Sequence, residues 1–137
     1  MNSFADCESL VTDPLIVLQE KRSKITFNNP RRSTVRRVVV DGCVITKGPR
    51  CDYLLINDSS VEHFVELKGS DVRHALAQLE SSIRQVSADV REGQKKAFVI
   101  STRCPLASTE VQAQQFYFRK KYKTTLIIRA SGYKCTI

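Results

Sequence analysis

The sequence predicts an α/β (or α+β) domain in which helices cover both faces of a mixed central sheet. Three observations support this prediction. Two strand-like runs at 51–56 and 61–67 flank a cluster of turn-forming residues. Apolar residues then recur at spacings of three and four between Val72 and Val90, which is the period of an amphipathic helix. A strand at 97–100, a helix from 108 to about 122 and a strand at 125–128 follow in alternation.

The N-terminal third of the chain contains weaker signals. Asp13-Pro14 is typical of a helix start, which predicts two helical turns from Leu15 to Arg22. Asp41-Gly42 stands between apolar runs and predicts a tight hairpin. Strands are expected at 25–27, 35–40 and 43–45. The long helix after residue 69 is expected to be capped by Ser70 or Asp71 and to end at Glu92-Gly93.

The central hairpin is expected to be buried on both faces. Tyr53 and Leu55 occupy one face of the first strand, and Leu54 and Ile56 occupy the other. Apolar residues on both faces are typical of a sheet that is covered on both sides. A charged residue at this hairpin would be costly to bury without a partner, so it should lie at a sheet edge or in a cleft.

Length and composition limit the possible classes of protein. A chain of 137 residues is expected to form a single domain, 1–137, with a core of its own. No stretch approaches the roughly 20 apolar residues of a membrane span. The N-terminus lacks a basic n-region and an apolar h-region, so we expect a cytoplasmic protein. The five cysteines are widely spaced with no C-x-x-C, which favours reduced, mostly buried thiols over a zinc site.

The net charge of +8 is concentrated in one segment. Residues 21–50 contain nine basic residues and one acid, and the rest of the chain is balanced. Such a patch is typical of a protein that binds a polyanion, most commonly nucleic acid, although a solvated basic surface remains an alternative. Five arginines are the best candidates for phosphate contacts: Arg31, Arg32, Arg36, Arg37 and Arg50. Because Arg36 and Arg37 are adjacent on a strand, they should face opposite ways.

Two acids and a lysine form the strongest functional signal. If the hairpin folds symmetrically about its turn, Asp52 lies opposite Glu66, within one residue. Side chains two apart on a strand share a face, so Lys68 should point the same way as Glu66. Two carboxylates can hold a hard divalent cation and a water molecule beside it. This arrangement is suited to phosphodiester hydrolysis.

Asp52 at the start of one strand and Glu66-Leu67-Lys68 at the end of the next resemble the signature of the PD-(D/E)xK nuclease superfamily, which has the restriction-endonuclease-like fold. The resemblance implies that Mg²⁺ or Mn²⁺ is held by Asp52, Glu66 and the carbonyl oxygen of Leu67. It also implies that Lys68 orients or deprotonates a water molecule, and that Gln78 on the following helix assists. Cys51 stands where the signature has proline, a position that varies widely.

The resemblance leaves several points open. Many members add an acid from a first helix, for which Glu8 and Glu20 are both candidates. A homodimer would supply two sites, one for each strand of DNA. The chain is therefore expected to be a metal-dependent endonuclease that acts on nucleic acid, with DNA as the expected substrate. The alternative is a non-cutting nucleic-acid-binding or protein-interaction module on the same fold.

Overall fold

The computed structural model describes residues 4–67, 71–102 and 106–137. The first element in these ranges is a short 3₁₀ helix, η1 (Ala5–Cys7). The two α-helices in these ranges are α1 (Val72–Val86) and α2 (Ser108–Tyr122). The strands are β1 (Glu8–Val11), β2 (Leu15–Glu20), β3 (Ser23–Asn28), β4 (Val35–Val39), β5 (Tyr53–Ile56), β6 (Glu62–Leu67), β7 (Lys95–Ser101), β8 (Thr124–Ala130) and β9 (Tyr133–Thr136).

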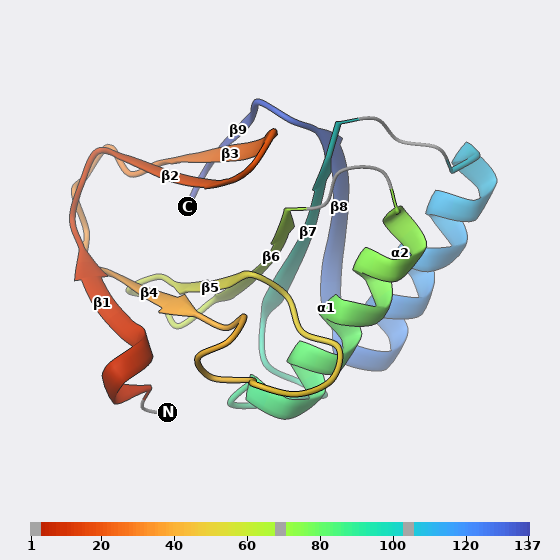
Figure 1. The fold of residues 1–137 in the computed structure, drawn as a ribbon, viewed down its shortest axis with the longest axis horizontal. Coiled ribbons are helices and arrows are strands. Elements are labelled where there is room, and N and C mark those ends of the chain that lie inside the picture. Colours follow the sequence, from red (N-terminus) through yellow and green to blue (C-terminus); the bar gives the residue numbers. More distant parts are fainter. Residues whose placement is uncertain (1–3, 68–70, 103–105) are drawn as a thin grey trace.

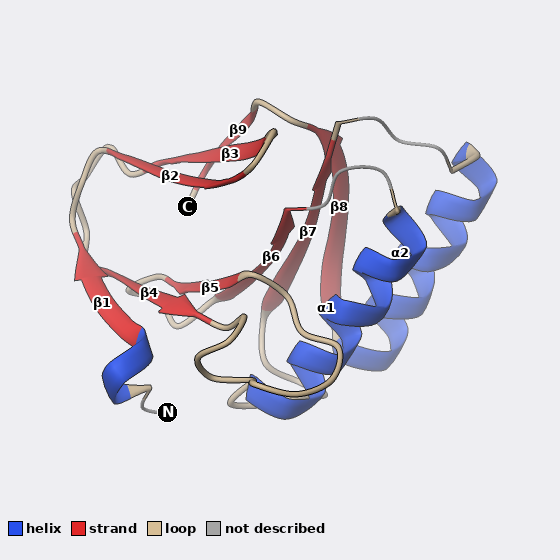
Figure 2. Cartoon of the chain, viewed as in Figure 1, coloured by secondary structure: helices blue, strands red, loops and turns tan. Residues whose placement is uncertain are grey.

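The strands form two sheets (Figure 1). The larger is six-stranded, in the order β1-β4-β5-β6-β7-β8, and the smaller is three-stranded, in the order β2-β3-β9. In the larger sheet β1, β4, β5 and β6 pair antiparallel, whereas β6, β7 and β8 pair parallel. The predicted α/β class with a mixed central sheet is therefore confirmed (Figure 2).

Both helices lie on the same face of the large sheet, so the prediction of helices on both faces was wrong. Residues of α1 and α2 share one apolar cluster with alternate residues of the sheet, including Leu54 and Phe64. The opposite face, with Leu55 and Val65, packs against the small sheet. The physical reason is the order in which the chain adds strands to the sheet. Two successive right-handed crossovers, β6-α1-β7 and β7-α2-β8, advance in one direction across the sheet and place both helices on one side.

The segment predicted as a short helix is strand β2. Its residues alternate, with Ile16 and Leu18 buried and Leu15 and Val17 exposed, which is the period of a half-buried strand. The capping signal at Asp13-Pro14 misled the prediction, because Pro14 lies just before the strand. β2 pairs with β3 over its whole length, so tertiary pairing outweighs the local signal.

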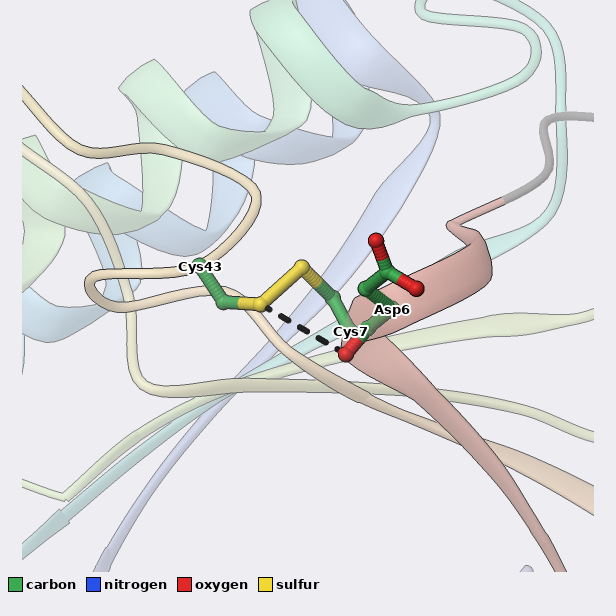
Figure 3. Close-up of a disulfide and its surroundings, with 3 residues drawn as sticks. All are labelled: Asp6, Cys7 and Cys43. Carbon is green, nitrogen blue, oxygen red and sulfur yellow. Dashed lines mark hydrogen bonds between the residues drawn. A yellow bond between two sulfur atoms is a disulfide. The ribbon is translucent and has the colours of Figure 1, made fainter.

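The predicted return strand at 43–45 is also wrong. After β4 the chain makes a tight turn, in which Ile45 N donates to Val40 O at 3.0 Å and one isolated bridge joins Asp41 to Ile45. This turn is tied to the N-terminus by a disulfide between Cys7 and Cys43 (Figure 3). The expectation that all cysteines are reduced is therefore wrong for this pair. Sequence spacing could not reveal it, because the two cysteines are 36 residues apart and meet only when β1 pairs with β4.

Helix α1 ends at Val86, earlier than predicted, because the buried carboxylate of Glu62 binds the residues that follow the helix. Glu62 at the start of β6 accepts hydrogen bonds from Ser87 Oγ at 2.5 Å and from Ala88 N at 2.9 Å. The Nζ of Lys95 is buried nearby and donates to the carbonyl oxygens of Asp89 and Gly93 at 2.7 and 2.6 Å. Burial lowers the pKa of Lys95, and the charge of Glu62 opposes that shift. The cluster fixes the connection between α1 and β7.

Replacing Glu62 with Ala is expected to lower the free energy of unfolding by about 2 kcal/mol, because the Ser87 hydroxyl and the Ala88 N–H lose their partner and the ammonium of Lys95 loses a nearby negative charge. Urea denaturation would measure the loss. Glu62→Gln keeps an acceptor and should lose less. If Glu62→Ala is as stable as the wild type, the carbonyl oxygens of Asp89 and Gly93 are sufficient to stabilise the buried Lys95.

Candidate metal site on the central hairpin

Strands β5 and β6 bring the two acids together. The register pairs Tyr53 with Val65 and Leu54 with Phe64, and Asp52 directly precedes the first of these pairs, so it lies within one residue of the position opposite Glu66. Asp52 N donates to Val65 O at 3.1 Å, and Leu67 N donates to Asp52 Oδ2 at 2.7 Å. Asp52 thus receives a hydrogen bond from the backbone of the residue after Glu66. Lys68, the third member of the predicted group, lies outside the described residues.

Burial dominates the electrostatics of this pair. Glu66 is 3% exposed. The pKa of Asp52 is raised chiefly by burial, and the negative charges of Glu20 and Asp41 raise it further. The Leu67 N–H and a hydrogen bond from Glu66 act in the opposite direction. Two acids this close together are costly to ionise at the same time when one of them is buried. A divalent cation would supply positive charge that offsets this cost.

Helix α1 holds the segment that leads into Asp52. The Nε2 of Gln78 donates to Arg50 O at 2.9 Å, and Cys51 N donates to Ser82 Oγ at 2.7 Å. The Oε1 of Gln78 is buried and has no hydrogen-bond partner within the described part of the chain. Gln78 therefore contacts the backbone two residues before Asp52 and has an acceptor that a bound water molecule would satisfy. Ser82 was not predicted as a functional residue. Its position four residues after Gln78 on the same helix face was the available signal.

The neighbouring thiol of Cys51 has no nucleophilic character. It is fully buried, and burial raises its pKa to about 12. A thiol with so high a pKa stays protonated at neutral pH and acts as a small apolar side chain. The position before Asp52 thus serves packing.

The two candidates for a third acid have different surroundings. Both lie on strands, whereas the resemblance implied an acid on a first helix. Glu8 on β1 forms a bidentate ion pair with Arg36 at 2.7 and 3.0 Å, which lowers its pKa. Glu20 at the end of β2 accepts from Tyr53 Oη at 3.3 Å, and its charge acts on Asp52. Glu20 is therefore the better placed. No group of three acid, histidine or cysteine side chains among the described residues is close enough together to hold a metal.

The predicted phosphate-binding arginines do not form one patch. Arg31 and Arg32 are exposed in the turn before β4, at the end of that strand remote from Asp52. Arg36 is paired with Glu8, and Arg37 lies 5.4 Å from the Tyr53 ring on the opposite face, as their adjacency predicted. Arg50 pairs with Asp41 at 2.6 Å. Of the five, Arg50 is the nearest to Asp52 along the chain.

His63 lies in the core and outside the acidic pair. It is 1% exposed, stacks against Phe98 and contacts the edge of Phe27, as expected for a packed histidine. Burial lowers its pKa to about 4 from an ordinary 6.5, despite contacts with the carbonyl oxygens of Leu55 and Val61. The folded protein therefore contains the neutral ring.

This depressed pKa predicts acid sensitivity. The contribution of the neutral His63 is complete above pH 6.5, and it is lost as the pH falls toward 4, because the unfolded chain binds the proton first. The loss should reach about 3 kcal/mol. Urea denaturation between these pH values measures it, with His63→Gln as the variant in which the pH dependence should flatten. An equally steep pH dependence in that variant would assign the effect to the carboxylates.

Comparison with protein-family models, with curated proteins and with solved structures finds no match. Neither helix of the described ranges has the length and apolar character that crossing a membrane requires.

Proposed function

We propose that this protein is a metal-dependent nuclease that hydrolyses phosphodiester bonds in nucleic acid, with DNA as the expected substrate. The observation that supports the proposal is the contact of Asp52, which directly precedes β5, with the end of β6 beside Glu66, where the Leu67 N–H donates to Asp52 Oδ2. A buried glutamate beside a half-buried aspartate is costly when both are ionised, and a divalent cation is the ligand that would offset their repulsion.

The available donors fit a hard cation. Carboxylate oxygens of Asp52 and Glu66 and the carbonyl oxygen of Leu67 are the ligand types that Mg²⁺ and Mn²⁺ prefer. When bound, such an ion stabilises charge on the phosphate and acidifies a water molecule. Gln78 would accept a hydrogen bond from a water molecule, and Lys68 would orient that molecule and offset the charge of the phosphate. A second copy of the chain would provide a second site for the other strand of a duplex.

One observation favours a non-cutting module instead. Asp52 Oδ2 accepts the N–H of Leu67, so this carboxylate also closes the end of the hairpin and has a structural role without any metal. A nucleic-acid-binding or protein-interaction module could keep Asp52 for that purpose alone. The net charge of +8 suits nucleic acid under both proposals.

Cleavage assays separate the two proposals. Supercoiled plasmid and four-way-junction DNA are incubated with the wild type, Lys68→Ala and Lys134→Ala while Mg²⁺ or Mn²⁺ is titrated. The wild type and Lys134→Ala, a matched change at an exposed lysine of the small sheet, should cut, and Lys68→Ala should not. If wild type and Lys68→Ala give the same background, the nuclease proposal fails. DNA binding that persists without cutting would then support the non-cutting module.

A further inference from the structure

The turn between β2 and β3 is fixed to the end of the large sheet where the acidic pair lies. Ser131 Oγ donates to Arg22 O at 2.9 Å and accepts from Lys24 N at 3.0 Å. Gly132 N donates to Lys24 O at 2.8 Å, and Ser131 N donates to Ser101 O at the end of β7 at 2.8 Å. These bonds attach the turn to the carboxyl ends of β7 and β8. Figure 1 shows the β2–β3 turn beside the upper end of β7.

The same turn is adjacent to the candidate metal site. Glu20, the last residue of β2, accepts from the hydroxyl of Tyr53, which follows Asp52 in the chain. The charge of Glu20 is the largest effect of a neighbouring charge on the Asp52 carboxyl. The next residues, Lys21 and Arg22, therefore project from a place close to the acids.

Three cations are available to a ligand here, two in the turn and one at the start of β3. Lys21, Arg22 and Lys24 are exposed, and none of them forms an ion pair with another described residue. By contrast, Arg36 and Arg50 of the same basic segment already have carboxylate partners. Among the described residues, the β2–β3 turn and the start of β3 thus present positive charge that can still bind phosphate.

The local backbone also departs from ordinary turn chemistry. Glu20 pairs with Ser23, which leaves only Lys21 and Arg22 in the turn, and Lys21 has a φ of +51°. Two-residue turns with positive φ favour glycine or asparagine. A lysine at this position lowers the local stability of the turn. Residues in unfavourable backbone conformations are concentrated at functional sites.

From these observations we infer that Lys21 and Arg22 of the β2–β3 turn, with Lys24 at the start of β3, bind the sugar-phosphate backbone of the nucleic acid and hold it beside Asp52 and Glu66. The inference rests on the proposed function for its ligand. The chemical reason is that the two acids repel a polyanion, and adjacent cations are needed to offset that repulsion. The turn binds phosphate, so its affinity should be independent of base sequence.

Binding of a fluorescein-labelled DNA duplex, measured by anisotropy in EDTA at several salt concentrations, tests this inference apart from cleavage. Lys21→Glu/Arg22→Glu should weaken binding at least tenfold and make the log–log salt slope shallower by about 0.9 for each phosphate that the turn no longer neutralises. Arg91→Glu/Lys120→Glu makes the same charge change at two exposed positions, one in the connection between α1 and β7 and one near the end of α2, and should bind like the wild type. Equal affinity and salt slope for Lys21→Glu/Arg22→Glu and the wild type would overturn the inference.

A second variant guards against misfolding of the turn. Lys21→Gly removes one charge while giving the positive-φ position its preferred residue. It should melt no lower than the wild type and still bind DNA more weakly, and unchanged binding would count against the inference. If the wild type binds DNA through this turn but does not cut, the proposed function fails and this inference stands. If the wild type cuts DNA while both turn variants bind normally, the proposed function stands and this inference fails.

Discussion

Replacing Glu66 with Gln should reduce metal-dependent cleavage about 100- to 1,000-fold. The change keeps the shape of the side chain but removes a charge that would hold the cation opposite Asp52. Asp52→Asn should have a similar effect, because it retains an acceptor for Leu67 N and loses a metal-binding charge. Initial rates on plasmid DNA over a range of Mn²⁺ concentrations measure the loss. A variant that reached the wild-type rate would show that the acid pair does not bind the catalytic ion.

The same two variants should fold at least as well as the wild type when no divalent cation is present. Burial raises the pKa of Asp52 above its ordinary 3.8, so ionising this group opposes folding. The contribution of protonated Asp52 is complete below pH 3.8 and is lost as the pH rises through the raised pKa. Asp52→Asn should therefore gain stability relative to the wild type as the pH rises. Added Mn²⁺ should make the wild type the more stable protein, because the ion stabilises the wild type alone. If Mn²⁺ stabilises the wild type and Asp52→Asn to the same extent, the ion binds at another site.

The central hairpin was predictable because local and long-range signals agree there. Turn formers separate two runs of strand-forming residues, and symmetric folding about them already places Asp52 within one residue of the position opposite Glu66. Helix α1 was predictable for the same reason, because its apolar stripe has a single period and faces a single surface.

Other features depend on partners far away in the sequence. β2 is a strand because it pairs with β3 and covers Leu55 and Val65, which its own capping signal does not indicate. The ion pair of Arg36 with Glu8 depends on the pairing of β1 with β4, so a count of charges overestimates the arginines that can bind phosphate. The exposed cations of the β2–β3 turn were visible in the sequence, but their place near Asp52 follows from the second sheet.

Reducing the Cys7–Cys43 disulfide should lower the free energy of unfolding by about 4 kcal/mol, because the bond closes a long loop and restricts the unfolded chain. The loop is 36 residues long and contains β1 to β4. Urea denaturation with and without dithiothreitol, and of Cys43→Ser, measures the difference. Cys135→Ser, which changes a half-buried thiol outside the disulfide, should leave the effect of the reductant unchanged.

The tethered turn also supports the candidate site, which gives this disulfide a second measurable consequence. Val40 N and Asp41 N both donate to Asp52 O, at 3.0 and 3.3 Å, and Cys43 lies in the turn that follows them. Reduction should therefore speed amide exchange at Val40 and Asp41 more than at Phe98 in the core, because the turn loses its covalent anchor. Thiol labelling of the unfolded, unreduced protein should detect three of the five cysteines. If it detects all five, or if exchange and stability do not respond to reductant, the bond does not form in solution, and the reduced thiols expected from cysteine spacing are the correct state.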